Sequence, residues 1–405
     1  MACYPRVLSV KTPADAEREL VAIGLDPFSI RNMGPKMLHR LLLLERIGLQ
    51  EGNILKQEIL SLGGDAAVGG KGVEREPALV SVILMGTDKQ LRRLCANLSQ
   101  QAFGLPSLAF DLLRLLETEA DPPRTWKIAG RTLDFSQRPC IMGILNVTPD
   151  SFYDGSSYYT VEQAVERAIE MQEEGADIID IGGESTRPYA RPVDQAEELS
   201  RVMPVVKGLA GKLSIPLSID TFKSGVANEA LGAGVEIVND ISGLTFDERM
   251  ADVVAAAGAG LVLMHTRGRP EEMQNDTVYR SLIAEVTASL RGSLSLAAAA
   301  GIEIERIIVD PGIGFGKSVA GNLEILRRLP ELNVLGCPIM VGTSRKSFID
   351  GVLGRPVNER LFGTAATVAH ALSNGASIFR VHDVRAMRDV ADMAKALLEP
   401  PAGLL

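Results

Sequence analysis

The sequence is poor in several residue types on which secreted and metal-rich proteins depend. Aromatic residues make up 4% of the 405 residues, with a single Trp, so core packing must rest on Leu, Ile, Val and Ala. The four cysteines (Cys3, Cys95, Cys140 and Cys337) lie far apart without a CxxC pair. This spacing argues against structural disulfides and a zinc site, and it favours a reducing, cytoplasmic location. The four histidines form no HxH or HxxxH pair, which argues against a transition-metal site.

Long apolar runs and basic tracts are also missing. No segment reaches the roughly 18 apolar residues that a membrane span needs. The N-terminal sequence MACYPRVLSV lacks the apolar region of a signal peptide. The net charge of −9 argues against a general nucleic-acid-binding surface, so an anionic substrate would need a local cluster of Lys and Arg. We therefore expect neither nucleic acid nor a membrane as a partner.

The clearest boundary in the chain is the segment DPPRT at 121–125, which we interpret as a linker. Before it, residues 1–120 are predicted to form a small α/β or α+β domain of unknown role. In that domain PRVLSV and ALVSVILMG are typical of strands, whereas ADAERELVAIG, MLHRLLLLERIG and DKQLRRLCANLSQQ are typical of helices. After the linker, residues 126–399 are predicted to form a second domain.

In the second domain, apolar runs alternate with amphipathic helical segments, which is typical of a parallel β/α fold. The predicted strands are 141–148, 176–183, 216–221, 235–241, 260–266, 306–312, 338–344 and 377–383. Eight such strands predict a (β/α)8 TIM barrel of the α/β class. An open doubly wound sheet is the alternative, but it would usually carry a Gly-rich turn after its first strand, and none is present. WKIAGRTLDF (126–135) is predicted to form a hairpin that closes the barrel floor.

Polar residues follow almost every predicted strand, and the carboxyl ends of barrel strands meet at one mouth. These residues are Asn146, Asp150, Asp154, Glu184, Ser185, Thr186, Arg187, Asp220, Asn239, Asp240, His265, Asp310, Ser344, Arg345, Lys346, Ser347, Arg380 and His382. Carboxylate and amide oxygens of Asp220, Asn239 and Asp310 suit a flat heterocycle with several N–H donors. A cationic set suits a phosphate or diphosphate. That set is Arg187, Arg345, Lys346, Arg380 and His382.

Two other local patterns have simpler interpretations. GIGFGKS (312–318) resembles a phosphate-binding P-loop, but Pro311 stands where that motif requires Gly, so we interpret it as a barrel loop. His370 and His39 each lie in a predicted helix and are interpreted as packing or surface residues. No GxSxG elbow is present, so a Ser-His-Asp mechanism is not proposed.

Several longer segments resemble the motifs of dihydropteroate synthases. They are GILNVTPDSFYDG (143–155), GADIIDIGGESTRP (175–188), SIDTFKSGVANEAL (218–231), NDISG (239–243), DPGIGFGK (310–317), GTSRKS (342–347) and RVHDV (380–384). They occur in the family's order and cover about 126–398. The resemblance implies condensation of a pterin pyrophosphate with p-aminobenzoate, which gives 7,8-dihydropteroate and pyrophosphate, with Mg²⁺ as cofactor. It also implies a homodimer.

The resemblance assigns roles residue by residue. The pterin would lie against Asp220, Asn239, Met264, Asp310 and Lys346. The p-aminobenzoate would lie against Thr186, Arg187, Pro188, Phe315 and Ser347. The pyrophosphate would bind Asn146, Arg380 and His382, with Mg²⁺ at Asn146. The reaction itself would involve Asp154, Thr186, Lys346, Arg380 and His382.

The sequence also departs from the family pattern, and other functions are possible. Thr266 stands where the family often has an apolar residue, the loop after Asp154 reads GSSYYT, and many members lack the N-terminal domain. One alternative is a methyltetrahydrofolate–corrinoid methyltransferase, which has a similar barrel but needs no pyrophosphate site. Another is a pterin-binding protein without catalysis.

Overall fold

The structure is a computed structural model that describes residues 4–69, 79–102, 104–148 and 160–399. It divides into two compact units, Met1–Pro122 and Pro123–Leu405, and the division falls within the predicted linker. Among the described residues, no helix has the length and apolar character needed to cross a membrane.

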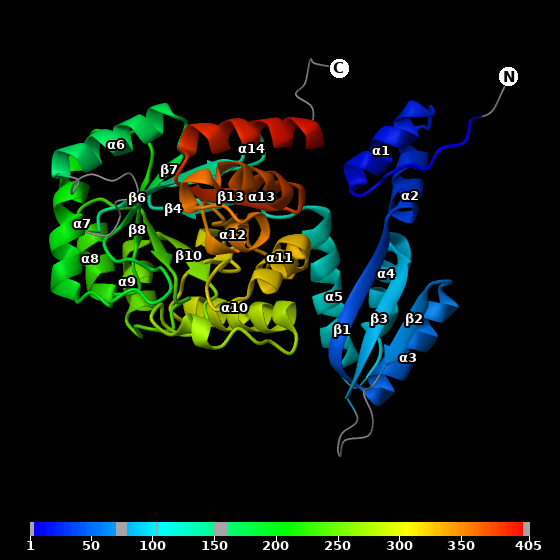
Figure 1. The fold of residues 1–405 in the computed structure, drawn as a ribbon. Helices are drawn as coiled ribbons and strands as arrows, with labels where there is room; N and C mark the ends of the chain where they lie inside the picture. Colours follow the sequence, from blue (N-terminus) through cyan, green and yellow to red (C-terminus); the bar gives the residue numbers. More distant parts are fainter. Residues whose placement is uncertain (1–3, 70–78, 103, 149–159, 400–405) are drawn as a thin grey trace. The chain divides into compact units, whose positions relative to one another are not determined.

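The first unit is built on a three-stranded antiparallel sheet of order β1-β3-β2 (Figure 1). Its elements are α1 (Pro13–Ala22), α2 (Pro27–Met37), β1 (His39–Gly48), α3 (Leu49–Ser61), β2 (Asp65–Gly69), β3 (Leu79–Thr87), α4 (Asp88–Leu98) and α5 (Leu105–Ala120). Side chains of the sheet and of α3, α4 and α5 form one apolar core. The unit therefore has a core of its own.

Two sequence predictions for this unit are wrong. MLHRLLLLERIG was expected to be helical, but β1 occupies most of it and pairs with β3. Leu42 and Leu44 are buried, whereas Leu41 and Leu43 are exposed. This alternation is that of a strand with one covered face, and four identical residues in a row cannot reveal it. PRVLSV, expected to be a strand, forms no regular element, while the strand predicted at ALVSVILMG is confirmed as β3.

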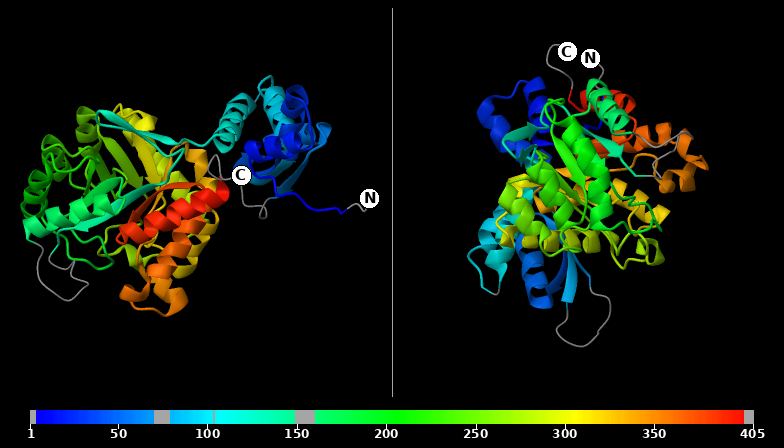
Figure 2. Two further views of the ribbon diagram at one scale, coloured as in Figure 1. Left: turned by 90° about the horizontal axis from the view of Figure 1, so that it is seen from above. Right: turned by 90° about the vertical axis from the view of Figure 1, so that its left-hand side faces the viewer.

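The second unit is a closed eight-stranded parallel barrel, which confirms the predicted TIM fold. Its strands are β6 (Cys140–Asn146), β7 (Ile178–Gly182), β8 (Leu217–Asp220), β9 (Ile237–Asp240), β10 (Gly260–Met264), β11 (Ile307–Asp310), β12 (Ile339–Val341) and β13 (Ala376–Val381). Its helices are α6 (Val161–Glu173), α7 (Gln195–Leu209), α8 (Ser224–Gly232), α9 (Met250–Ala257), α10 (Leu282–Ala299), α11 (Val319–Arg327), α12 (Ser347–Leu353), α13 (Leu361–Ser373) and α14 (Val384–Leu398). In Figures 1 and 2 these helices surround the strands.

The predicted hairpin is present as β4 (Thr125–Ile128) and β5 (Arg131–Asp134). Trp126 is fully buried and packs with Ile128 among apolar side chains inside the barrel. The Trp126 indole Nε1 donates a hydrogen bond to the carbonyl oxygen of Arg306 at 2.8 Å. The hairpin therefore closes the amino-terminal end of the barrel, as expected, and leaves the other end for ligands.

The barrel interior changes from apolar to polar along the strands. Near the hairpin it is filled by apolar residues such as Met142, Ile178 and Ile308. Because side chains alternate along a strand, residues two positions further on face the same interior. From Ile178 and Ile308 these are Asp180 and Asp310, both buried. The fold therefore places buried carboxylates next to the apolar layer that fills the amino-terminal end of the barrel.

Candidate functional site

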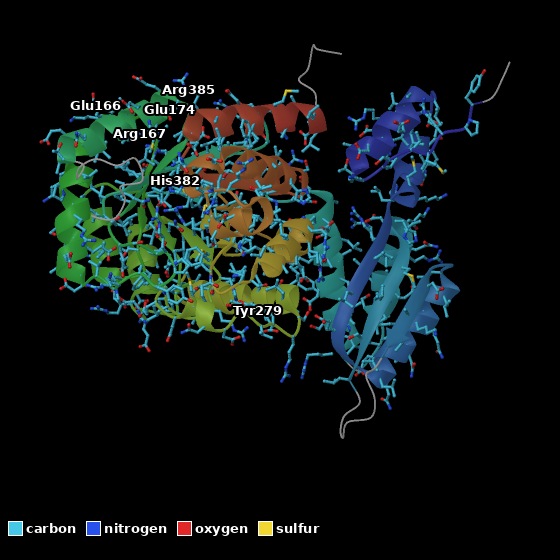
Figure 3. The ribbon with its side chains drawn as sticks, in the orientation of Figure 1. Glu166, Arg167, Glu174, Tyr279, His382 and Arg385 are labelled. Carbon is cyan, nitrogen blue, oxygen red and sulfur yellow. The ribbon has the colours of Figure 1, made fainter. Side chains whose placement is uncertain are left out.

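A cavity of about 1310 Å³ opens at the carboxyl ends of the strands. It extends outward between α6 and α14, where Arg167, Glu174 and Arg385 line it (Figure 3). Beneath it lies a smaller cavity of about 60 Å³, and the two share lining residues such as Lys346 and Arg380. The two cavities therefore form one site with a wide outer part and a narrow, deep inner part.

The structure brings the described members of the predicted site together. The outer cavity is lined by Asn146, Thr186, Arg187, Pro188, Asp220, Phe315, Lys346, Ser347, Arg380 and His382. The inner cavity adds Asn239, Met264 and Asp310. Asp154, predicted to take part in the reaction, lies outside the described residues. The assigned ligand contacts of these residues stay predictions.

One buried residue of the site was missed by the sequence analysis. Asp180, in the middle of β7, is fully buried. Its Oδ2 accepts a hydrogen bond from Arg380 Nε at 2.6 Å and another from Asn239 Nδ2 at 3.0 Å. Arg380 Nη2 donates to Asp220 Oδ2 at 2.7 Å. Arg380 thus bridges two carboxylates, and an Asp inside an otherwise apolar strand was the signal that could have revealed this network.

Each carboxylate has a second oxygen that Arg380 does not contact. Among the described residues, Asp180 Oδ1 and Asp220 Oδ1 are buried without a hydrogen-bond partner. A buried acceptor without a partner is costly, and native proteins rarely keep one without a reason. Asp220 lines both cavities, so its Oδ1 suits an N–H donor of a bound molecule, whereas Asp180 lines neither cavity.

Burial raises the pKa of Asp220 to about 7, although the Arg380 guanidinium opposes the shift. Burial also raises the pKa of Asp310, against the opposing charge of Lys346. Asp310 Oδ1 accepts a hydrogen bond from the Gly312 backbone N–H at 2.7 Å, which fixes its orientation. Such shifted carboxyls in a cleft are typical of functional sites.

Lys346 projects into both cavities from the loop between β12 and α12. Its Nζ donates to the carbonyl oxygen of Ile313 and lies 4.6 Å from the centre of the Phe315 ring. Burial lowers the pKa of Lys346 to about 8, and the Asp310 carboxylate opposes that shift. At neutral pH the side chain therefore remains a cation, placed between the deep acceptors and the outer cavity.

The predicted cationic set needs one correction. Burial, followed by the charges of Arg380 and Arg345, lowers the pKa of His382 to about 3. His382 is therefore neutral at physiological pH and serves as a hydrogen-bonding group, not as a positive charge. Its Nδ1 lies 3.0 Å from Ser344 Oγ, which also accepts the His382 backbone N–H. Arg345 is paired with Asp383, whose Oδ2 accepts a hydrogen bond from Arg345 Nε at 3.0 Å.

The segment GIGFGKS is a barrel loop, as expected, and its first glycine makes a close backbone approach. A Cβ at Gly312 would lie 1.9 Å from the carbonyl oxygen of His265, and the φ angle there is +70°. The buried Lys317 secures the same loop, because its Nζ lies 2.8 Å from the Phe315 carbonyl oxygen and 2.8 Å from His265 Nδ1. Lys317 is therefore part of the loop's support and lines neither cavity.

The loop between β7 and α7, which carries Thr186, Arg187 and Pro188, forms part of the rim of the outer cavity. It is tied to the loop after β10, because the Tyr189 N–H donates to the Pro270 carbonyl oxygen at 3.0 Å. Phe315 and Ser347 line the same cavity. The rim is therefore built from loops that follow several different strands.

Asn146 could supply one of the ligands of a magnesium ion, but not the whole set. A Cβ at Gly182 would lie 3.4 Å from Asn146 Oδ1 and 3.7 Å from Asp220 Oδ2, so both oxygens border the same small space. In the described part of the chain, no group of three or more His, Cys, Asp or Glu could hold a metal. Mg²⁺ usually keeps waters and binds one or two protein oxygens plus substrate phosphates. The residues present fit that mode of binding.

The chain is similar to proteins of known name over the whole barrel. The model of a family described as pterin binding enzyme matches residues 142–382. A dihydropteroate synthase of Synechocystis sp. is 48% identical over 270 residues, which are 66% of this chain and 93% of that protein. A solved dihydropteroate synthase of Xanthomonas albilineans with 4-aminobenzoic acid is 42% identical, with a TM-score of 0.64, and the match covers 69% of this chain and 99% of that one.

The similarity also reaches beyond the barrel. A probable bifunctional folylpolyglutamate synthase/dihydropteroate synthase of Halobacterium salinarum is 42% identical over 373 residues. The match covers 91% of this chain but only 44% of that protein. Because the second unit is about 70% of the chain, the match must extend into the first unit. From the barrel, its polar mouth and these similarities together, the chain belongs to the pterin binding enzyme family.

Proposed function

We propose that the chain is a dihydropteroate synthase, a transferase that condenses 6-hydroxymethyl-7,8-dihydropterin pyrophosphate with p-aminobenzoate. The observation that carries the proposal is the order of groups along the cavity. The buried acceptors of Asn239 and Asp310 line only the inner cavity, whereas Asp220 and the cations of Lys346 and Arg380 line both cavities. A ligand with a heterocycle at one end and a polyanion at the other fits this order.

The pterin ring would bind in the inner cavity. Its amino and ring N–H groups would donate to Asp220 Oδ1, which has no hydrogen-bond partner among the described residues. Asn239 and Asp310 would supply further polar contacts, and Met264 would pack against the ring. Binding would then satisfy a buried acceptor that is costly to leave unpaired.

The pyrophosphate would extend toward the outer cavity. Arg380 and Lys346 would supply positive charge, and the neutral imidazole of His382 would donate a hydrogen bond. Asn146 would hold Mg²⁺, which would supply positive charge to stabilise the leaving group. Preorganised charges of this kind lower the barrier most where charge develops.

The p-aminobenzoate would bind in the outer cavity against Thr186, Arg187, Pro188, Phe315 and Ser347. We propose a dissociative order of bond changes. The C–O bond to pyrophosphate breaks first and the leaving group keeps the electron pair. The arylamine nitrogen then attacks the methylene carbon and loses its proton. Exclusion of water by the rim loops would protect the cationic intermediate, and Asp154 is predicted to stabilise it.

A turnover assay tests this function. The purified chain, given the pterin pyrophosphate, p-aminobenzoate and Mg²⁺, should release one pyrophosphate for each dihydropteroate formed. Methyl transfer from methyltetrahydrofolate without pyrophosphate release would support the corrinoid methyltransferase alternative. Ligand binding without either product would support a non-catalytic protein. We also expect a homodimer, which sedimentation equilibrium can test.

A further inference from the structure

A buried ion cluster lies beneath the rim loop and outside both cavities. It consists of Glu184 at the start of that loop, Glu198 on α7 and Lys223 in the turn after β8. Their side chains are 7%, 0% and 17% exposed, respectively. None of the three lines either cavity. Any influence on the reaction must therefore pass through neighbouring residues.

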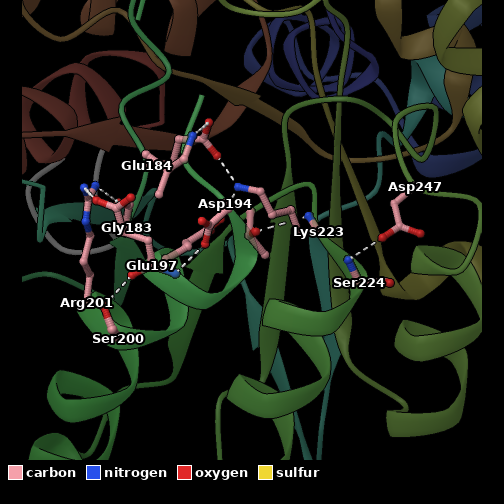
Figure 4. Close-up of polar contacts among 12 residues, drawn as sticks. Gly183, Glu184, Asp194, Glu197, Ser200, Arg201, Lys223, Ser224 and Asp247 are labelled. Carbon is pink, nitrogen blue, oxygen red and sulfur yellow. Dashed lines mark hydrogen bonds and ion pairs between the residues drawn. The ribbon is translucent and has the colours of Figure 1, made fainter. Parts of the chain in front are cut away.

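Glu184 closes the base of the rim loop. Its Oε1 accepts a hydrogen bond from the Val193 backbone N–H at 3.1 Å, which joins the two ends of the segment 184–193. The preceding residue is also held, because Arg201 Nη1 on α7 donates to the Gly183 carbonyl oxygen at 2.8 Å (Figure 4). A Cβ at Gly183 would lie only 2.6 Å from Val202 Cγ1, so the loop begins in close contact with α7.

Lys223 connects this base to the pterin side of the proposed site. Its Nζ pairs with Glu184 Oε2 (Figure 4). The same Nζ also pairs with Glu198 Oε2. Lys223 lies three residues after Asp220, and its backbone N–H donates to Thr221 Oγ1 at 3.2 Å. The turn that follows Asp220 and the loop that carries Thr186 therefore share one ionic anchor.

The position of the loop depends on the balance of charges in this cluster. One ammonium group compensates two carboxylates, so loss of the Lys223 charge would leave two like charges buried together. Removing one partner of a buried ion pair is strongly destabilising to the local arrangement, because the remaining charge is uncompensated. Movement of Glu184 toward water would relieve this repulsion, and it would release the Val193 N–H and open the base of the loop.

We infer that Glu184 and Lys223 are positioning residues that set the geometry of the p-aminobenzoate loop, and Glu198 supports them. The inference rests on the proposed function. Through Glu184, the cluster holds Thr186 and Pro188 against the outer cavity, while the inner cavity keeps its own contacts through Arg380. Its disruption should therefore weaken use of the arylamine more than binding of the pterin.

The substitution Lys223→Met tests this role. The KM for p-aminobenzoate should rise by roughly 10- to 100-fold, the scale of small misplacements of substrate-binding groups. The dissociation constant of the pterin pyrophosphate, measured by calorimetry, should stay unchanged. Lys223→Arg keeps the charge and should restore most of the affinity. Arg328→Gln, which removes a surface ion pair with Glu324, is the matched control and should change neither constant.

Amide hydrogen exchange gives a readout that is independent of turnover. In Lys223→Met, peptides that cover 184–194 should exchange faster, whereas peptides from α10 should not. If this variant fails to fold, Glu184→Gln replaces it, because the amide oxygen can still accept the Val193 N–H while the charge is lost. Turnover with an unchanged KM and unchanged exchange would overturn the positioning role alone. No turnover in the unaltered chain would overturn the proposed function and, with it, the substrate assigned to this loop.

Discussion

At the residue scale, Asp220 and Lys346 provide the sharpest test of the pterin contacts. Asp220 offers a buried Oδ1 that has no partner in the described part of the chain, and Lys346 is a cation that lines both cavities. We predict that Asp220→Ala and Lys346→Ala each lower kcat/KM by about 100-fold or more, the scale at which preorganised charged groups act. Steady-state kinetics with titrated pterin pyrophosphate measures the loss. Near-normal kinetics in both variants would contradict the site assignment.

The pH dependence should report the same two residues. The pKa of Asp220 is raised to about 7, so the carboxylate forms as the pH rises through that value. The pKa of Lys346 is lowered to about 8, so its cation is lost above that value. We predict a bell-shaped profile of kcat/KM with limbs near pH 7 and pH 8. Lys346→Arg should move the basic limb to higher pH, because guanidinium stays protonated.

Unfolding does not explain the acid limb. Between pH 3.8, the ordinary pKa of an Asp, and about pH 7, Asp220 keeps its proton in the folded state. In the unfolded chain the same carboxyl has already lost its proton. By linkage, ionisation of Asp220 therefore lowers the free energy of unfolding as the pH rises through this window. A loss of thermal stability that coincides with the acid limb would contradict the assignment of that limb to Asp220.

The sequence predicted the positions of the site residues better than their interactions. Strand ends identify Asp220, Asn239, Asp310 and Lys346, because a parallel barrel brings such ends to one mouth. Asp180 was missed because it lies inside a strand, where only the tertiary contact with Arg380 shows its role. The charge of His382 was predicted wrongly, because a pKa depends on burial that the sequence does not display.

At the element scale, the hairpin β4–β5 should matter for stability and not for chemistry. Trp126 is fully buried at the barrel floor, away from the mouth. We predict that Trp126→Ala lowers the free energy of unfolding by about 3–5 kcal/mol, the usual cost of truncating a buried Trp. Chemical denaturation measures the change. Activity per folded molecule should be retained, and a selective loss of kcat without destabilisation would be the contrary result.

Helices and strands could be predicted where the local hydrophobic pattern of the sequence matches the conformation in the fold. The barrel strands are apolar runs between helices, and all eight observed strands overlap the predicted ones. β1 was misread as a helix because its run of four leucines has neither a helical nor an alternating period. Its pairing with β3 over most of its length decides the strand conformation, and that contact is not local.

At the scale of the whole molecule, the second unit should act without the first. The two units have separate apolar cores, and the described site residues all belong to Pro123–Leu405. The Synechocystis relative matches the chain over 270 residues, which correspond to 93% of that protein. We predict that a fragment of residues 123–405 folds and retains turnover, as circular dichroism and the pyrophosphate assay can measure. A folded but inactive fragment would show that the first unit takes part in the reaction.

The most direct measurement of the central claim is a crystal structure of the chain with the pterin pyrophosphate and a non-reactive p-aminobenzoate analogue. We predict ring N–H groups on Asp220 in the inner cavity, phosphates beside Arg380 and His382, and the analogue against Thr186. A heterocycle bound in the outer cavity, with no contact to Asp220 Oδ1, would contradict this claim.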